Sequence, residues 1–152
     1  MCIRDRGTVV VGSGNYPFNI YVQGNYLYEV NNEGNQLEIF NVSNPNNPVQ
    51  MSSIYAGNTP SGLFVSGQYA YITNEYGNTM VIVNISNPVA PTIVDTVTTL
   101  AEPNQVYVSG NYAYVVDVSG NYLQTFDVSN PYNAVLTSTV TTPGSSPGPR
   151  CV

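Results

Sequence analysis

Acidic side chains are the main candidates for chemistry in this sequence. The three cationic residues, Arg4, Arg6 and Arg150, lie close to the two ends of the 152-residue chain, and there is no histidine. Carboxylates between residues 7 and 149 therefore have no basic partner in that stretch. Such oxygen ligands suit a hard cation such as Ca²⁺, which binds about six to eight oxygens. The predicted ligands, which are otherwise simply solvated acidic loop residues, are Glu33, Glu75, Glu102 and Asp117.

Most residues that perform covalent or acid–base catalysis are absent. The sequence has no lysine, its only cysteines are Cys2 and Cys151, and no glycine-rich phosphate loop leads into a helix. Two cysteines near opposite ends are weak evidence for a disulfide. We therefore predict no catalytic residue, no cofactor beyond the Ca²⁺ considered above, and no enzymatic activity. A carboxylate or metal mechanism stays open as the alternative.

Composition limits the partners and the location. Charged residues make up 8% of the chain, and the net charge is −6. Without a basic patch the chain is a poor partner for nucleic acid or for anionic lipid. No run of about 18 apolar residues is present that could insert into a membrane. An acidic, weakly charged surface is typical of an extracellular or cell-surface protein, which is the location that we expect.

An internal repeat defines the elements that must position these side chains. The sequence aligns with itself at a shift of 43 residues without a gap, and Pro17, Pro60 and Pro103 open the three copies. So many matches cannot plausibly arise by chance. The clearest correspondences are Val22–Tyr28 with Val65–Tyr71 and Val108–Tyr114, and Asn41–Pro45 with Asn84–Pro88 and Asp127–Pro131.

Each copy divides into four short extended runs separated by turn residues. Glycine and asparagine tolerate a positive φ, and proline cannot donate to a strand ladder, so Gly-Asn and Asn-Pro pairs indicate turns. Four strands in about 40 to 45 residues are typical of a β-propeller blade, whereas an immunoglobulin-like sandwich needs about 100 residues. We therefore predict an all-β fold, a partial β-propeller of three four-stranded antiparallel blades. In the first copy the predicted strands are Asn19–Val22, Tyr26–Val30, Gln36–Val42 and Val49–Tyr55.

The third strand and the turn after it carry a family signature. Met80–Pro88 reads MVIVNISNP, and with the hairpin Ser-Gly-Asn-Tyr-Ala-Tyr-Val it resembles the LVIVD repeat of bacterial and archaeal surface proteins. The resemblance covers residues 17–142. It implies a surface-displayed or secreted β-propeller with no common enzymatic activity and no set of active-site residues. Asn84 replaces the usual Asp, which Asp127 keeps, so we interpret Asn41 and Asn84 as hydrogen-bonding turn residues rather than glycosylation sites.

Three blades are fewer than a closed ring needs, since propellers have about four to eight. The remaining blades of the same chain are therefore expected partners, and we expect the apolar faces of an open array to self-associate. The predicted segments are a non-native or leader segment at 1–7, the end of a preceding blade at 8–16, blades at 17–59, 60–102 and 103–142, and a tail at 143–152.

Two groups of residues are predicted to contact a partner. First-strand side chains should line the central channel of a propeller, whereas Tyr76 and Tyr132 interrupt the repeat and lie in loops. Tyrosines at a constant repeat position are expected to fill the space between blades instead. The predicted channel residues are Asn19, Tyr21, Phe64, Gln105 and Tyr107.

Together these features favour a non-enzymatic surface or secreted propeller module that binds a protein or a glycan. One alternative is a fragment of a propeller enzyme, a hydrolase or lyase that depends on carboxylates and a metal. The other is a set of spacer repeats in a larger adhesin. The fold class alone does not separate them.

Overall fold

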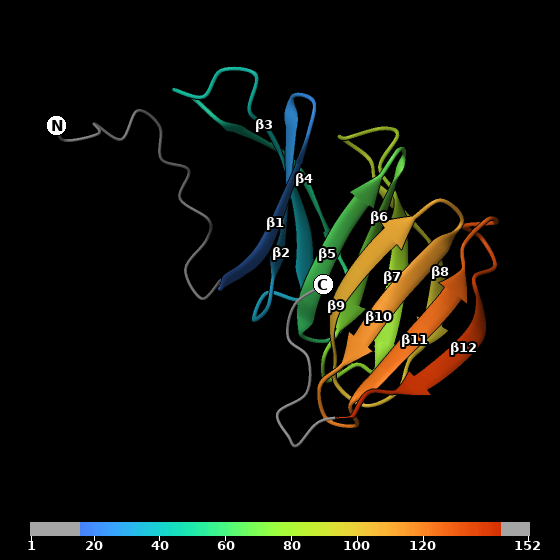
Figure 1. Ribbon diagram of the computed structural model, residues 1–152. Helices are drawn as coiled ribbons and strands as arrows, with labels where there is room; N and C mark the ends of the chain where they lie inside the picture. Colours follow the sequence, from blue (N-terminus) through green and yellow to red (C-terminus); the bar gives the residue numbers. More distant parts are fainter. Residues whose placement is uncertain (1–15, 144–152) are drawn as a thin grey trace, which may run out of the picture.

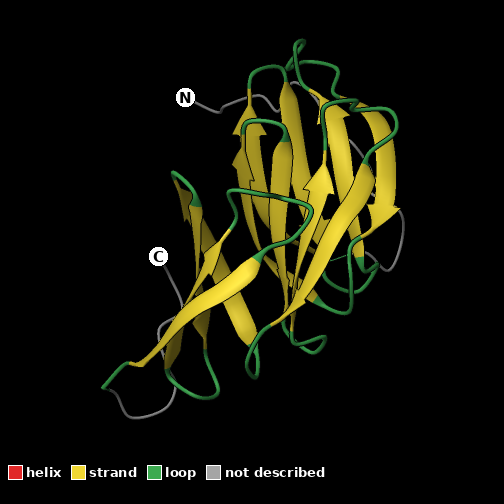
Figure 2. Ribbon diagram, turned by 90° about the vertical axis from the view of Figure 1, so that its right-hand side faces the viewer, coloured by secondary structure: helices red, strands yellow, loops and turns green. Residues whose placement is uncertain are grey.

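The computed structural model describes residues 16–143, and in this range it contains three separate four-stranded antiparallel sheets and no helix (Figures 1 and 2). This confirms the predicted fold class. In each sheet the strands are hydrogen-bonded in chain order. The first sheet has β1 (Pro17–Gln23), β2 (Tyr26–Asn31), β3 (Gln36–Asn41) and β4 (Val49–Tyr55); the second has β5 (Pro60–Ser66), β6 (Tyr69–Asn74), β7 (Thr79–Asn84) and β8 (Thr92–Thr98); the third has β9 (Pro103–Ser109), β10 (Tyr112–Asp117), β11 (Tyr122–Asp127) and β12 (Val135–Thr141).

The strand ends follow the local backbone preferences of the turn residues. Gly24, Gly67 and Gly110 join the first two strands of each sheet at φ values of 61°, 59° and 58°, a region that glycine enters at little cost. β1 begins two residues earlier than the predicted Asn19, at Pro17. Proline is tolerated as the first residue of a strand, where a missing amide hydrogen costs least.

The middle sheet buries both of its faces. Along β7, Val81 and Val83 belong to the apolar core between the first and second sheets. The alternate residues Met80 and Ile82 belong to the core between the second and third sheets. All four are at most 3% exposed, and burial of each contributes about 1.5–3 kcal/mol. The middle sheet therefore packs against a neighbouring sheet on each of its two faces, as a propeller blade does.

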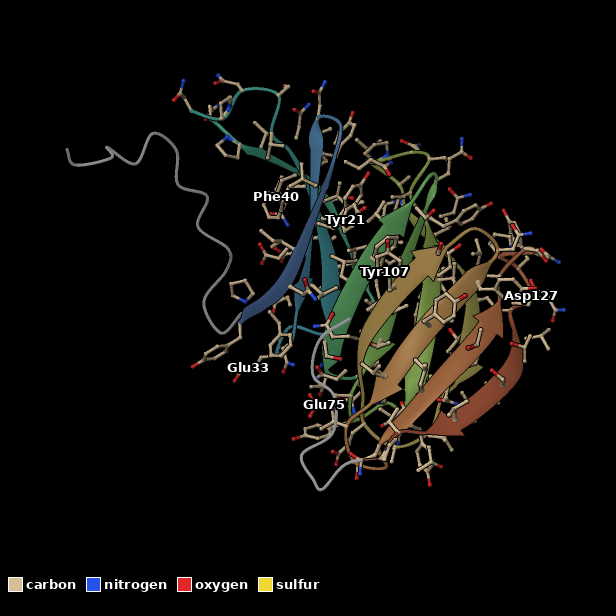
Figure 3. All side chains as sticks on the ribbon, in the orientation of Figure 1. Tyr21, Glu33, Phe40, Glu75, Tyr107 and Asp127 are labelled. Carbon is tan, nitrogen blue, oxygen red and sulfur yellow. The ribbon has the colours of Figure 1, made fainter. Side chains whose placement is uncertain are left out.

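The arrangement of strands creates two distinct rims. β1, β5 and β9 lie side by side as the innermost strands (Figure 1). Loops between the second and third strands share one rim with the links between blades, and the other turns form the opposite rim. Figure 3 shows Glu33 and Glu75 on the first rim and Asp127 on the other.

The predicted segments at the two ends, 1–7, 8–16 and 143–152, lie outside the described residues except for residues 16 and 143. Over the part of the chain that the structure describes, no helix is long and apolar enough to cross a bilayer.

Candidate binding site

A glycine in the middle blade brings side chains of the outer two blades together. Asn19, Gly62 and Gln105 occupy one repeat position on β1, β5 and β9. A Cβ at Gly62 would lie 2.8 Å from the Asn104 carbonyl oxygen and from the Cα of Gln105, closer than real Cβ atoms approach. The absence of a side chain at Gly62 therefore lets β9 pack closely against β5. Asn19 Nδ2 donates to Gln105 Oε1 at 3.4 Å and to the Ser61 carbonyl at 3.3 Å.

A pocket of about 380 Å³ opens on this side of the inner strands, and Phe18, Glu75, Asn104, Gln105 and Val118 line it. All three blades contribute, since Phe18 lies on β1, Glu75 follows β6, and the other three residues belong to the third blade. The lining combines an aromatic ring, two amides and one carboxylate. A volume of this order is at the low end for small-molecule pockets, which span roughly 300–1,000 Å³.

Hydrogen bonds tie the loops of the pocket rim to the links between blades. Asn35 Oδ1 accepts from the Thr59 amide at 2.7 Å, and the Thr59 carbonyl accepts from the Glu75 amide at 2.9 Å. In the next blade, Asn78 Oδ1 accepts from the Glu102 amide at 3.0 Å. The Glu102 carbonyl in turn accepts from the amide of Val118 at 3.0 Å. These bonds hold the backbones of two pocket-lining residues in place.

Both link residues adopt an unusual backbone conformation. Thr59 has φ 59° and Glu102 has φ 58°, and each precedes a proline. A positive φ is rare for a β-branched residue such as threonine, and it persists only where the surroundings compensate. The hydrogen bonds that the Thr59 and Glu102 amides donate to Asn35 and Asn78 provide that compensation, so they hold the backbone of the rim in place.

The four carboxylates predicted to bind a cation do not come together. Glu75 lines the pocket, Glu33 is exposed, Glu102 is half-buried, and Asp117 is fully buried. Within residues 16–143, no three acidic side chains form a group that could hold a metal ion. The physical reason is that each blade contributes separate loops to the rim, and the Asp117 side chain is enclosed in its blade. One of the four carboxylates thus lines the pocket, and the calcium site stays a prediction.

Asp117 instead occupies a structural position at the end of the second strand. The equivalent residues Asn31 and Asn74 are also fully buried. Asn31 Oδ1 accepts from the Gly34 amide at 2.9 Å, and Asn74 Nδ2 donates to Thr79 Oγ1 at 3.2 Å. Neither carboxylate oxygen of Asp117 has a hydrogen-bond partner, and burial raises the pKa of its carboxyl to about 7.

The aromatic residues of the inner strands form a row. The rings of Tyr21 and Phe64 lie 5.2 Å apart, and those of Phe64 and Tyr107 lie 4.7 Å apart, both in edge-on geometry. Figure 3 shows Tyr21 and Tyr107 on the inner strands. Edge-on pairs of this kind contribute about 0.5–1.5 kcal/mol beyond the area that they bury. The structure thus brings the five predicted first-strand residues into two contacting sets, this row and the Asn19–Gln105 pair.

Tyr76 and Tyr132, the two predicted loop contacts, lie on opposite rims. Tyr76 is 66% exposed in the loop after β6, beside Glu75. Tyr132 is 58% exposed in the turn before β12. Tyr132 lies near Tyr69. The pKa of the Tyr69 hydroxyl is raised first by partial burial, and then by the charge of Tyr132 and by the hydrogen bond between the two side chains. Tyr76 is therefore the one of the two that adjoins the pocket rim.

The turn that follows the third strand is built around a side-chain acceptor. The backbone amide two residues later donates to it, and this bond lowers the pKa of Asp127. Asn and Asp are interchangeable as such acceptors. The geometry therefore accounts for the interpretation of Asn41 and Asn84 as turn residues. The bonds are Ser43 N to Asn41 Oδ1 at 2.9 Å, Ser86 N to Asn84 Oδ1 at 2.9 Å and Ser129 N to Asp127 Oδ1 at 2.8 Å.

A buried pair of glutamates is absent from the sequence-based predictions. Glu29 on β2 lies directly opposite Glu38 on β3, and the two are 8% and 3% exposed. Burial raises the pKa of both carboxyls, and the charge of Glu38 raises that of Glu29 further. Ile72 and Val81 occupy these positions in the second blade. The signal that could have revealed the pair is a charge at two repeat positions that carry no charge in the other copies.

The same comparison between copies could have indicated the pocket. Phe18 aligns with Ser61 and Asn104, and Gly62 aligns with two amide residues. Where the residue type at one repeat position differs between the copies, the side chains at that position do not all make the same packing contacts. Which of these positions meet in space still depends on how the blades stack.

Three four-stranded blades with their first strands side by side define the chain as a β-propeller repeat protein. The LVIVD repeat family matches residues 14–56, 56–99 and 103–142. The chain therefore belongs to the LVIVD repeat family, as the resemblance of Met80–Pro88 predicted. Among curated proteins, none matches the chain.

Solved propeller structures are similar in fold. The periplasmic gluconolactonase of Pseudomonas aeruginosa has a TM-score of 0.81 at 16% identity over 93% of this chain and 43% of that one. A functionally unknown protein from Desulfotomaculum acetoxidans has a TM-score of 0.75 at 16% identity, over 85% and 43%. The β-propeller domain of Cps50 (Swd1) from Myceliophteria thermophila has a TM-score of 0.70 at 12% identity, over 86% and 42%.

At these identities the likeness shows the fold alone. The chain spans less than half the length of each of these three structures.

Proposed function

We propose that this chain is part of a non-enzymatic β-propeller module, displayed at the cell surface or secreted, that binds a protein or glycan ligand. The observation that carries the proposal is the pocket of about 380 Å³ to which all three blades contribute side chains. Small-molecule sites are typically concave, with apolar walls and a few convergent polar groups. Phe18, Asn104, Gln105 and Glu75 supply that combination.

The construction of the two rims supports binding at the pocket side. On the opposite rim the turn after each third strand repeats the same side-chain bond from blade to blade. On the pocket rim the corresponding loop residues are Asn32, Glu75 and Val118, which differ in charge and polarity. Hydrogen bonds accepted by the Asn35 and Asn78 side chains keep this rim in place before a ligand arrives. A pre-organised site loses less conformational entropy on binding.

The described carboxylates favour binding over catalysis. Glu75 is the only acidic residue that lines the pocket within residues 16–143. Asp117, which has a pKa of about 7, is fully buried and lies outside the lining. A carboxylate mechanism usually needs two acidic groups that both reach the substrate.

The surface or secreted location is supported by composition. Between residues 7 and 149 the chain carries carboxylates and no basic side chain, and charged residues are only 8% of the total. Such a surface offers nothing to nucleic acid phosphates.

The proposal is tested by probing the immobilised chain with a glycan array and a displayed peptide library. Wild type is compared with a Glu75→Gln, Gln105→Ala variant and with Glu33→Gln, a change at an exposed glutamate on the same rim. We expect binding that the pocket variant loses and the control keeps. Binding that survives in the pocket variant would contradict this site, and no binding by the wild type would favour a spacer role. Hydrolysis of gluconolactone above the rate in buffer, lost in the pocket variant, would overturn the non-enzymatic assignment.

A further inference from the structure

The pocket is uncharged apart from a single carboxylate. Glu75 is the only ionisable side chain among its described lining residues. The sequence contains no lysine, arginine or histidine between residues 7 and 149. An anionic ligand would therefore meet a like charge, and residues 16–143 offer no cation to offset the cost of its desolvation. This disfavours uronic acids, sialic acids and sulfated or phosphorylated sugars as ligands.

The polar groups of the pocket match hydroxyl groups, which both donate and accept hydrogen bonds. The Asn19 amide donates to Gln105 Oε1 at 3.4 Å, which turns the Gln105 Nε2 donors to the other side of that side chain. Asn104 supplies a second amide with both functions. The Glu75 carboxylate adds a strong acceptor for hydroxyl protons.

Phe18 supplies the apolar surface. Its side chain is 52% exposed although it lines the pocket. The face of an aromatic ring packs well against a ligand that has an apolar side and a polar edge. Sugar rings have that character, because their C–H groups gather on one face and their hydroxyls project around it.

Gly62 makes the site specific to the middle blade. Its repeat partners, Asn19 and Gln105, carry side chains, whereas a Cβ at position 62 would press on the backbone of residues 104 and 105. Side chains of the first and third blades can therefore converge only over β5. A repeat protein thus carries an asymmetric site, formed once in the three described blades.

From these observations we infer that the pocket binds a neutral saccharide unit, a hexose or an N-acetylhexosamine. The inference rests on the proposed binding function and names its ligand class. Phe18 packs against the sugar ring, Gln105 and Asn104 bond its hydroxyls, and Glu75 accepts from them while repelling anionic sugars.

The test is a titration of the ¹⁵N-labelled full chain, followed by NMR through the side-chain amide signals of Asn104 and Gln105. The probes are matched pairs: glucose with glucuronate, and N-acetylglucosamine with its 6-sulfate, each at millimolar concentration. We expect at least one neutral probe to shift both signals, and its anionic counterpart to bind at least about tenfold more weakly. No shift with either neutral probe would overturn the inference, as would equal affinity for the members of a pair.

Variants locate the bound sugar. Phe18→Ala and Glu75→Gln should each weaken binding of the neutral probe by about tenfold, the equivalent of about 1.4 kcal/mol. Glu33→Gln, on the same rim but outside the pocket lining, should leave the affinity unchanged. Unchanged affinity in both pocket variants would place the sugar elsewhere and overturn the inference. A peptide that shifts the same amide signals while no neutral sugar does would leave the binding function standing and would remove only the saccharide.

Discussion

Asp117 is a single residue whose ionisation opposes folding. Its carboxyl is fully buried without a hydrogen-bond partner, and its pKa is raised from 3.8 to about 7. Because the folded state retains the Asp117 proton to a higher pH than the unfolded state, the contribution of this carboxyl to stability is greatest below about pH 4 and falls as the pH rises to about 7. By linkage this loss is at most about 4 kcal/mol.

We therefore predict that Asp117→Asn, which places the residue of the other two blades at this position, raises the free energy of unfolding at pH 8 and changes it little at pH 4. Urea denaturation at the two pH values measures this. Asp127→Asn is the matched control. The hydrogen bond from the Ser129 amide lowers the pKa of Asp127, so the contribution of the Asp127 carboxylate to stability is present at neutral pH and is lost on acidification. A loss of stability at pH 8 in Asp117→Asn would show that the buried carboxylate has a stabilising partner.

At the scale of elements, the β2–β3 ladder carries a like-charged pair. Glu29 and Glu38 face each other across the two strands, and burial raises the pKa of both carboxyls. Like charges directly opposite each other destabilise a sheet. Since both pKa values are raised, the unfavourable effect grows as the pH rises above the ordinary range of glutamate.

We predict that the double variant Glu29→Gln, Glu38→Gln is more stable than wild type at pH 7 and nearly equal to it at pH 4. Thermal unfolding followed by circular dichroism at both pH values would measure the difference. The exposed Glu33→Gln, which leaves the buried pair intact, serves as the control. A double variant that is less stable at pH 7 would contradict the repulsion.

The loop between β6 and β7 depends on one asparagine for two purposes. Asn78 has φ 50°, and its Oδ1 accepts from the Glu102 amide in the link to the next blade. Asn78→Ala should lower the free energy of unfolding by about 1–3 kcal/mol, because the left-handed conformation is unfavourable for alanine and the hydrogen bond to the Glu102 amide is lost. Asn78→Gly should cost less, since glycine accepts the φ and loses only the bond. Chemical denaturation of both variants tests this order, and equal costs would show that conformation is not involved.

For the whole molecule, the first and third blades present apolar side chains to solvent. Ile20 and Val22 on β1 are 58% and 55% exposed, whereas the equivalent Leu63 and Val65 on β5 are 4% and 1% exposed. On the third blade, Tyr107 and Val140 are 47% and 55% exposed, among others. Exposed apolar surface of this kind promotes association.

We therefore predict that the 152-residue chain self-associates in a concentration-dependent manner, and that Ile20→Ser with Val22→Ser weakens this association. Analytical ultracentrifugation over a range of concentrations is the measurement. As a control, Val89→Ser changes an exposed apolar residue in a turn and should leave the association unchanged. A monomer at every concentration would contradict the prediction.

By itself the sequence determined the blade. The 43-residue repeat, the Gly-Asn and Asn-Pro turns and the apolar runs such as Met80–Val83 located the strands to within a residue or two, because turn conformation and burial period are properties of neighbouring residues. The same local rules accounted for Asp127 as a turn acceptor.

Only the tertiary structure decided where the site lies. Asn19 and Gln105 are 86 residues apart and meet across the middle blade, where Gly62 lets β9 pack closely against β5. The packing of one blade against the next likewise decides which acidic side chains are buried. It buries Asp117 and the Glu29–Glu38 pair, and it leaves the four rim carboxylates apart. Contacts of this kind are set by the spacing of strands far apart in the chain, which no local pattern records.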